Sequence, residues 1–115
     1  MINTDLLYQR LGITPDQLLE FCHNNQMIEL ALFGSILRDD FQPNSDVDML
    51  VTFAPEAKVS LLQFIGMEQA LEYLLHRKVD LVQKSAVEKD YNPIRRRAIL
   101  ENYQVLYGAR SLISS

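Results

Sequence analysis

Blocks of apolar residues separated by polar turns predict that strands and helices alternate along this chain. Residues 27–33 and 46–53 form two short, nearly continuous apolar runs, which is the pattern of strands buried on both faces. A shorter run at 79–83 predicts a third strand, and residues 104–107 predict an edge strand. Such alternation is typical of an α/β fold, here an α/β sandwich around a small sheet.

Helix signals fill the intervals between these strands. Thr14, Pro15 and Gln17 have the types and spacing of a capping box with proline at the first helical position, which predicts a helix over 15–24. A longer helix is predicted over 60–76, where one face is marked at spacings of three and four by Leu61, Phe64 or Ile65, Glu68, Leu71 and Leu75. Shorter helical segments are expected at 4–10 capped by Thr4, at 36–40 capped by Ser35, at 85–90 and at 93–102.

Length and composition limit the class of protein. A chain of 115 residues is most simply one domain, residues 1–115, and buries roughly 65% of its extended-chain surface. The single cysteine, Cys22, allows no intramolecular disulfide. The start lacks a signal-peptide pattern, and no apolar run reaches the ~18 residues of a membrane span. These features predict a cytoplasmic protein with no membrane partner.

The formal net charge of −4 opposes binding to nucleic acid, because contacts from basic residues to phosphates dominate that affinity. We therefore expect no direct nucleic acid binding. A nucleotide carried as its magnesium complex remains compatible with this charge, since the metal ion offsets much of the phosphate charge.

Three carboxylates are expected to meet at one end of the sheet. Asp46 and Asp48 lie two residues apart at the start of the second predicted strand, so their side chains point the same way, roughly 6.5 Å apart. Asp80 follows the first residue of the third strand, and neighbouring strands lie about 4.8 Å apart. Clustered carboxylates raise one another's pKa, whereas Mg²⁺ favours carboxylates, waters and phosphate oxygens. The pattern predicts a magnesium site.

Gly34 and Ser35, at the end of the first predicted strand, would supply the other half of such a site. A glycine lets a ligand approach the backbone, and the free N–H groups of a helix start bind phosphate. The Ser35 hydroxyl is expected to donate to a β- or γ-phosphate oxygen. Arg38 is expected to face the same charge, with an ion pair to Asp39 or Asp40 as the alternative.

These groups together predict nucleotidyl transfer. Two metal ions about 3.5 to 4 Å apart clamp the attacking and leaving oxygens of an in-line displacement, from which pyrophosphate leaves. Asp46 and Asp48 would bind both ions, and Asp80 would hold the one that lowers the pKa of the acceptor hydroxyl. An isolated Asp-X-Asp is usually a solvated strand end and an isolated Gly-Ser a turn, but the four fixed residues together recur by chance in on the order of 10⁻³ of such chains.

The spacing of Gly34-Ser35, ten residues and then Asp46 and Asp48 resembles the signature of the DNA polymerase β-like nucleotidyltransferase superfamily. The small size and the runs NSDVDMLV and KVDLV resemble its minimal nucleotidyltransferase (MNT) branch, and the resemblance covers about residues 29–106. It implies a mixed β-sheet flanked by helices.

The resemblance also implies roles for individual residues. Gly34 and Ser35 would bind the triphosphate of ATP, and the three aspartates would hold two Mg²⁺ ions. Many members have Ala-Arg-Gly after the serine and one variable residue; Arg38 matches the arginine, whereas Asp39 stands in place of the glycine.

Minimal members of this branch are similar to antitoxins encoded beside all-helical HEPN-domain ribonuclease toxins. The resemblance implies transfer of AMP from ATP to a tyrosine hydroxyl of a HEPN-family toxin, which silences its ribonuclease activity. The chain is too small for a second domain that grips a substrate, so the acceptor is expected on a partner protein.

Two other functions remain open. One is a binding module that neutralises its partner by occlusion, with the acidic cluster as metal-stabilised structure. The other is nucleotidyl transfer to a small molecule or an RNA 3′ end, which the acidic charge and the absence of an added domain disfavour. The complete set of site residues favours an enzyme, because a degenerate member should have lost at least one of them.

Overall fold

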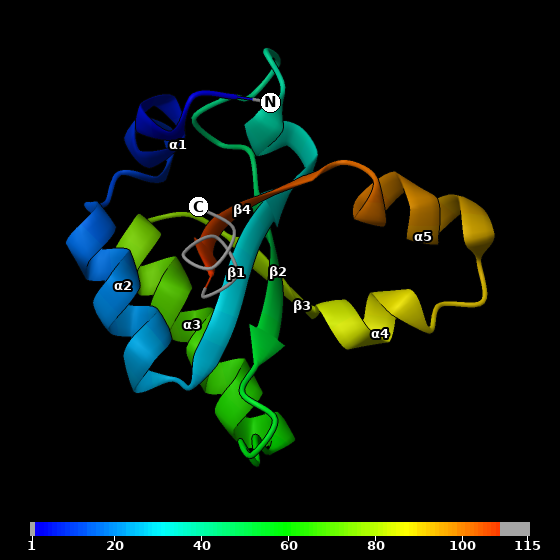
Figure 1. The fold of residues 1–115 in the computed structure, drawn as a ribbon. Helices are drawn as coiled ribbons and strands as arrows, with labels where there is room; N and C mark the ends of the chain where they lie inside the picture. Colours follow the sequence, from blue (N-terminus) through cyan, green and yellow to red (C-terminus); the bar gives the residue numbers. More distant parts are fainter. Residues whose placement is uncertain (1, 109–115) are drawn as a thin grey trace.

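The computed structural model describes residues 2–108 and contains a four-stranded sheet with helices on both faces (Figure 1). The strands are β1 (Met27–Phe33), β2 (Val47–Phe53), β3 (Val79–Gln83) and β4 (Tyr103–Gly108). Their order is β3-β2-β1-β4, and β1 pairs antiparallel with both β2 and β4, whereas β2 pairs parallel with β3. The prediction of a small mixed sheet flanked by helices is confirmed.

The helices begin close to the predicted positions. They are α1 (Thr4–Leu11), α2 (Pro15–Asn24), the 3₁₀ helix η1 (Gly34–Leu37), α3 (Leu61–Leu75), α4 (Lys84–Glu88) and α5 (Pro93–Leu100). The capping box predicted at Thr14 is present, and Ser60 forms a second one at the start of α3. The cap of α1 was wrongly predicted: Asn3 caps it, because its side chain accepts from the Asp5 N–H while Thr4 is already helical.

The segment after β1 also differs from the prediction. In place of a helix over 36–40 capped by Ser35, η1 is one 3₁₀ turn that begins without a side-chain cap, and Arg38 is already extended. The guanidinium of Arg10, on α1, donates to the carbonyls of Ile36 (2.6 Å) and Arg38 (2.8 Å). These carbonyls accept hydrogen bonds from a side chain of another element, so no further helical turn is needed to supply their donors.

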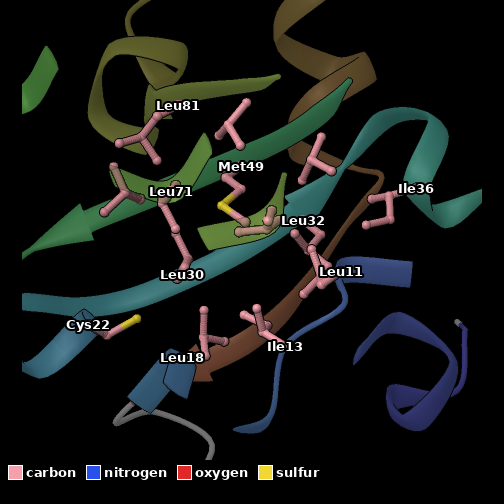
Figure 2. Close-up of a cluster of buried hydrophobic side chains, with 14 of the residues drawn as sticks. Leu11, Ile13, Leu18, Cys22, Leu30, Leu32, Ile36, Met49, Leu71 and Leu81 are labelled. Atoms are coloured by element: carbon pink, nitrogen blue, oxygen red, sulfur yellow. The ribbon is translucent and has the colours of Figure 1, made fainter. Parts of the chain in front are cut away.

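Each face of the sheet buries its own apolar cluster. The larger one joins β1, β2 and β3 to α1, α2 and α3, and Figure 2 shows its centre, where Leu30, Met49 and Leu71 meet. The smaller one is made by Ala31, Leu50, Val87 and Ile99, so α4 and α5 cover the other face. We call this second side the α4/α5 face. No helix within residues 2–108 is long and apolar enough to cross a membrane.

Helix α3 protects the edge strand β3. The Glu68 carboxylate accepts from the Leu81 N–H at 2.9 Å, and the Glu72 carboxylate accepts from the Val79 N–H at 3.1 Å. Glu68 therefore lies on the inward side, as predicted. Leu61 was predicted on the same side but is 76% exposed. Helix α3 is apolar on its solvent-facing side as well as on its core-facing side, so periodicity alone does not tell one side from the other.

A largely buried ion pair joins β1, α4 and β4 at the α4/α5 face. The Lys84 ammonium donates to the carboxylate of Glu29 at 3.2 Å and to the hydroxyl of Tyr103 at 2.9 Å. Burial lowers the pKa of Lys84, but the hydrogen bonds to Tyr103 and Glu29 outweigh it, so this pKa lies above its ordinary value. The pair anchors α4 to the sheet.

Replacing Lys84 by methionine is expected to lower the free energy of unfolding by about 2 to 4 kcal/mol at pH 7, because Glu29 is left buried without its cation. Urea unfolding measures the change, and Lys89→Met, at an exposed position directly after α4, is the control. The pKa of Lys84 is raised in the folded state, so its contribution is complete below pH 10.5 and is lost as the pH rises through the folded value. A loss no larger than that of Lys89→Met would contradict the anchoring role.

Candidate active site

The register of β2 and β3 sets two of the predicted carboxylates side by side. Asp48 is the direct partner of Asp80 in the parallel pair, and a 2.9 Å hydrogen bond from the Val47 N–H to the Lys78 carbonyl aligns the strand starts. Because side chains alternate along a strand, Asp48 and Asp80 share the α4/α5 face with Leu50. Asp46 lies one residue before β2, which begins one residue later than predicted, and its side chain is exposed.

Asp48 lies at the centre of the charge cluster. Its pKa is raised above the ordinary value, first by burial, then by the negative charges of Asp80 and Asp46, and the positive charge of Arg38 lowers it in part. The cluster therefore places a half-buried carboxylate next to two others. A divalent cation would relieve both penalties.

The carboxylates do not form a preassembled cage. Among residues 2–108, no group of three or more His, Cys, Asp or Glu side chains is gathered closely enough to hold a metal ion. The chemistry of the donor set nevertheless fits a hard divalent cation, because all the donors are carboxylate oxygens. The charges of Asp46 and Asp80 both act on Asp48, and the side chains of these two residues are exposed. Binding in this position requires rotation of those exposed side chains.

Gly34 makes room for the Asp48 carboxylate. It has a left-handed backbone (φ +78°), and a Cβ atom built on it would collide with Oδ2 of Asp48. Phe33, the preceding residue, is the direct partner of Asp48 across β1 and β2, so the sheet holds the carboxylate against this backbone. Only glycine allows the left-handed turn and the close approach together.

Ser35 and Arg38 lie on the same connection between β1 and β2. Ser35 is half-buried within η1, and its carbonyl accepts from the Arg38 N–H at 2.9 Å. The Arg38 guanidinium forms an exposed ion pair with Asp40 (3.2 Å), which is the alternative considered from the sequence. The positive charge of Arg38 also lowers the pKa of Asp48 in part, so Arg38 interacts with both Asp40 and Asp48.

An aromatic ring and two arginines hold the loop that leads to Asp46. The guanidinium carbons of Arg10 and Arg77 lie 5.5 and 4.7 Å from the centroid of the Phe41 ring. Arg77 also donates to the carbonyls of Gln42 (3.3 Å) and Ser45 (3.0 Å). We call Arg10, Phe41 and Arg77 the loop clamp. Sequence reasoning missed it, because no local pattern relates an arginine on α1 to one after α3.

A hollow of about 910 Å³ adjoins Gly34 and Arg38. Its walls come from the N-terminal segment, η1, the end of α5 and the start of β4, and include the rings of Phe33 and Tyr103. Reciprocal hydrogen bonds between the backbone of Ile2 and the amide of Gln104 (3.0 and 2.8 Å) fix one wall. This volume is in the range of pockets that bind nucleotide-sized ligands.

Comparisons with known proteins identify the family of this chain. The family model described as "Nucleotidyltransferase domain" matches residues 16–106. The chain is 48% identical over 60 residues to protein adenylyltransferase MntA of Thermococcus cleftensis, a stretch that is 52% of this chain and 59% of the relative, so the match spans less than two thirds of that protein.

Two solved structures share the fold. A chain of a toxin–antitoxin crystal structure with AMP-PNP has a TM-score of 0.65 at 18% identity, over 89% of this chain and 79% of that one. A chain from the complex of a tri-AMPylated HEPN toxin of Shewanella oneidensis with an MNT antitoxin has a TM-score of 0.56 at 17% identity, over 87% and 74%. With the family model covering most of its length, the chain belongs to the nucleotidyltransferase domain family.

Proposed function

We propose that this protein is an antitoxin that transfers AMP from ATP to a tyrosine hydroxyl of a HEPN-family ribonuclease toxin and thereby neutralises it. The observation that carries the proposal is the β2–β3 register, which pairs Asp48 with Asp80 while Gly34 lies against Asp48. The activity named for the MntA relative and the AMP-PNP and AMPylated toxin of the structural neighbours support the choice of reaction and partner.

Each residue of the site has a proposed role. Asp46, Asp48 and Asp80 would hold two Mg²⁺ ions, which when bound would neutralise phosphate charge and lower the pKa of the acceptor hydroxyl. Gly34 and Ser35 would bind the triphosphate through the backbone and the serine hydroxyl. Arg38 would leave its exposed pair with Asp40 for a phosphate oxygen, a stronger charge-assisted contact. The hollow beside η1 would take the nucleoside.

The proposed reaction is a single in-line displacement. The tyrosine oxygen forms a bond to the α-phosphorus of ATP, and the bond from that phosphorus to the bridging oxygen of the β-phosphate breaks. The electron pair leaves with pyrophosphate, and the phenolic proton passes to water. No covalent intermediate on this chain is required.

One observation favours an alternative, in which the chain neutralises its partner by binding alone: the carboxylates within residues 2–108 form no preassembled metal cage. The mass of the partner after coexpression separates the two functions. A gain of whole AMP units supports transfer, whereas an unmodified but inhibited partner supports occlusion and contradicts the proposed reaction.

Asp48→Asn is expected to reduce transfer of label from α-labelled ATP to a coexpressed HEPN toxin by on the order of 100-fold or more, because the central ligand loses its charge. The thermal midpoint should stay the same or rise, since the raised pKa of Asp48 means that its ionised form opposes folding at neutral pH. Asp16→Asn, on the exposed first turn of α2, is the control. Undiminished transfer by Asp48→Asn would exclude the site.

Gly34→Ala and Gly12→Ala form a matched pair, because both glycines have left-handed backbones (φ +78° and +73°). A Cβ at residue 34 collides with Asp48, whereas apart from the chain neighbours of Gly12 no heavy atom of residues 2–108 lies within 4 Å of a Cβ at residue 12. Gly12→Ala should lose about 1 to 2 kcal/mol of stability for its left-handed backbone alone, and Gly34→Ala should lose more because of the collision. Only Gly34→Ala should lose AMP transfer, and equal activities would refute a role for the close approach.

The loop clamp is expected to position Asp46. Arg77→Met removes the donor to the Ser45 carbonyl, next to Asp46, and should raise the Mg²⁺ concentration for half-maximal transfer by about 10-fold. Arg77→Lys keeps a cation over Phe41, so it should raise this Mg²⁺ concentration less than Arg77→Met does. The exposed Arg97→Met is the control. A change in rate with no change in magnesium dependence would contradict the positioning role.

A further inference from the structure

The solvent-facing side of α3 is apolar and uncharged. Leu61, Leu62, Ile65 and Tyr73 are 76, 80, 40 and 83% exposed. Gly66, Gln69 and Ala70, on the same side of the helix, are also exposed and uncharged. We call the set of seven the α3 stripe: Leu61, Leu62, Ile65, Gly66, Gln69, Ala70 and Tyr73. The two charged residues of α3, Glu68 and Glu72, point away from it to the edge of β3. Surface helices normally carry their charges outward, so this helix has the composition of one covered on two sides.

Gly66 has no internal reason to be a glycine. Apart from its chain neighbours and the backbone of its own helix, a Cβ at this position would meet no heavy atom of residues 2–108 within 4 Å, and its backbone is not left-handed. Glycine inside a helix costs about 1 kcal/mol relative to alanine. A small residue there does create a low point in the stripe together with Ala70, beside a hollow of about 320 Å³ between α2 and α3.

We infer that the α3 stripe is the interface of a homodimer in which α3 packs on α3 of a second copy. Residues four apart on a helix form ridges. Leu61, Ile65, Gln69 and Tyr73 form the high ridge, and the row of Leu62, Gly66 and Ala70 is low at its centre. Across a two-fold axis, the ridge of each copy fits into the low row of the other, with Ile65 over Gly66.

Charge and area favour a second copy as the occupant. Two chains of net charge −4 repel each other, so a contact between copies requires an uncharged surface, which the α3 stripe supplies. The exposed side chains of the stripe amount to on the order of 500 to 700 Å² per copy, at the low end of specific interfaces. A dimer that dissociates on dilution is therefore expected.

The position of the stripe separates it from the proposed acceptor. Helix α3 covers the face of the sheet opposite to the α4/α5 face, where Asp48 and Asp80 lie (Figure 1). A protein whose tyrosine enters that site contacts the α4/α5 face and leaves α3 uncovered. The dimer leaves the candidate active site of each copy open. The inference of a dimer does not depend on whether the chain transfers AMP.

Sedimentation velocity of the full chain over a concentration series tests this inference. The wild type should shift from monomer to dimer, and Leu62→Glu should stay monomeric to at least 10-fold higher concentration, because it buries an unpaired charge in the interface of each copy. Ile94→Glu, on α5, is the matched control, since Ile94 is also 80% exposed. A wild type that stays monomeric, or a dimer that Leu62→Glu leaves unchanged, would overturn the inference.

Cross-linking tests the packing independently. Ile65→Cys should form an intermolecular disulfide on mild oxidation, because residue 65 of each copy lies beside the two-fold axis, whereas Ile94→Cys should not. The native Cys22 does not compete: it is fully buried, and burial raises its pKa to about 12. Equal cross-linking of the two variants, or none from Ile65→Cys, would exclude α3-on-α3 packing.

Discussion

The candidate site depends on the parallel register of β2 and β3. A slip of one residue would turn every side chain of β2 to the opposite face, so Asp48 would enter the larger apolar cluster and Met49 would leave it. Burial of Val47, Met49 and Leu81 on one side therefore determines where the carboxylates lie on the other. The hydrophobic core and the charge cluster are two consequences of one strand pairing, and the chemistry requires no separate device to bring Asp80 to Asp48.

Local patterns predicted the parts of this arrangement that depend on neighbouring residues. Strand alternation placed Asp48 and Asp80 on the same kind of position, and the capping box located the start of α2. The parts that could not be predicted depend on distant contacts. η1 stays short because Arg10, more than 20 residues earlier, takes its carbonyls, and Leu61 is exposed because apolar character alone does not tell an inner face from an outer one.

The site is held at a cost in stability that other contacts offset. Three carboxylates around one half-buried position oppose folding, because burial and mutual repulsion both disfavour the charged form of Asp48. Against them stand two capping boxes, the loop clamp and the Lys84–Glu29 pair, which tie α1, α4 and the loop before β2 to the sheet. These contacts surround the cluster without entering it, so they stabilise the frame and leave the exposed Asp46 and Asp80 side chains free to rotate.

The glutamates of α3 restrict how another protein can attach to the sheet. With the Val79 and Leu81 amides already satisfied by Glu72 and Glu68, the β3 edge offers no donors at these positions to an incoming strand. Backbone pairing of the kind that joins a peptide to an open sheet is therefore blocked beside Asp80. Any protein that approaches this edge must be recognised through side chains and shape, which ties its selection to its own sequence and not to a generic extended segment.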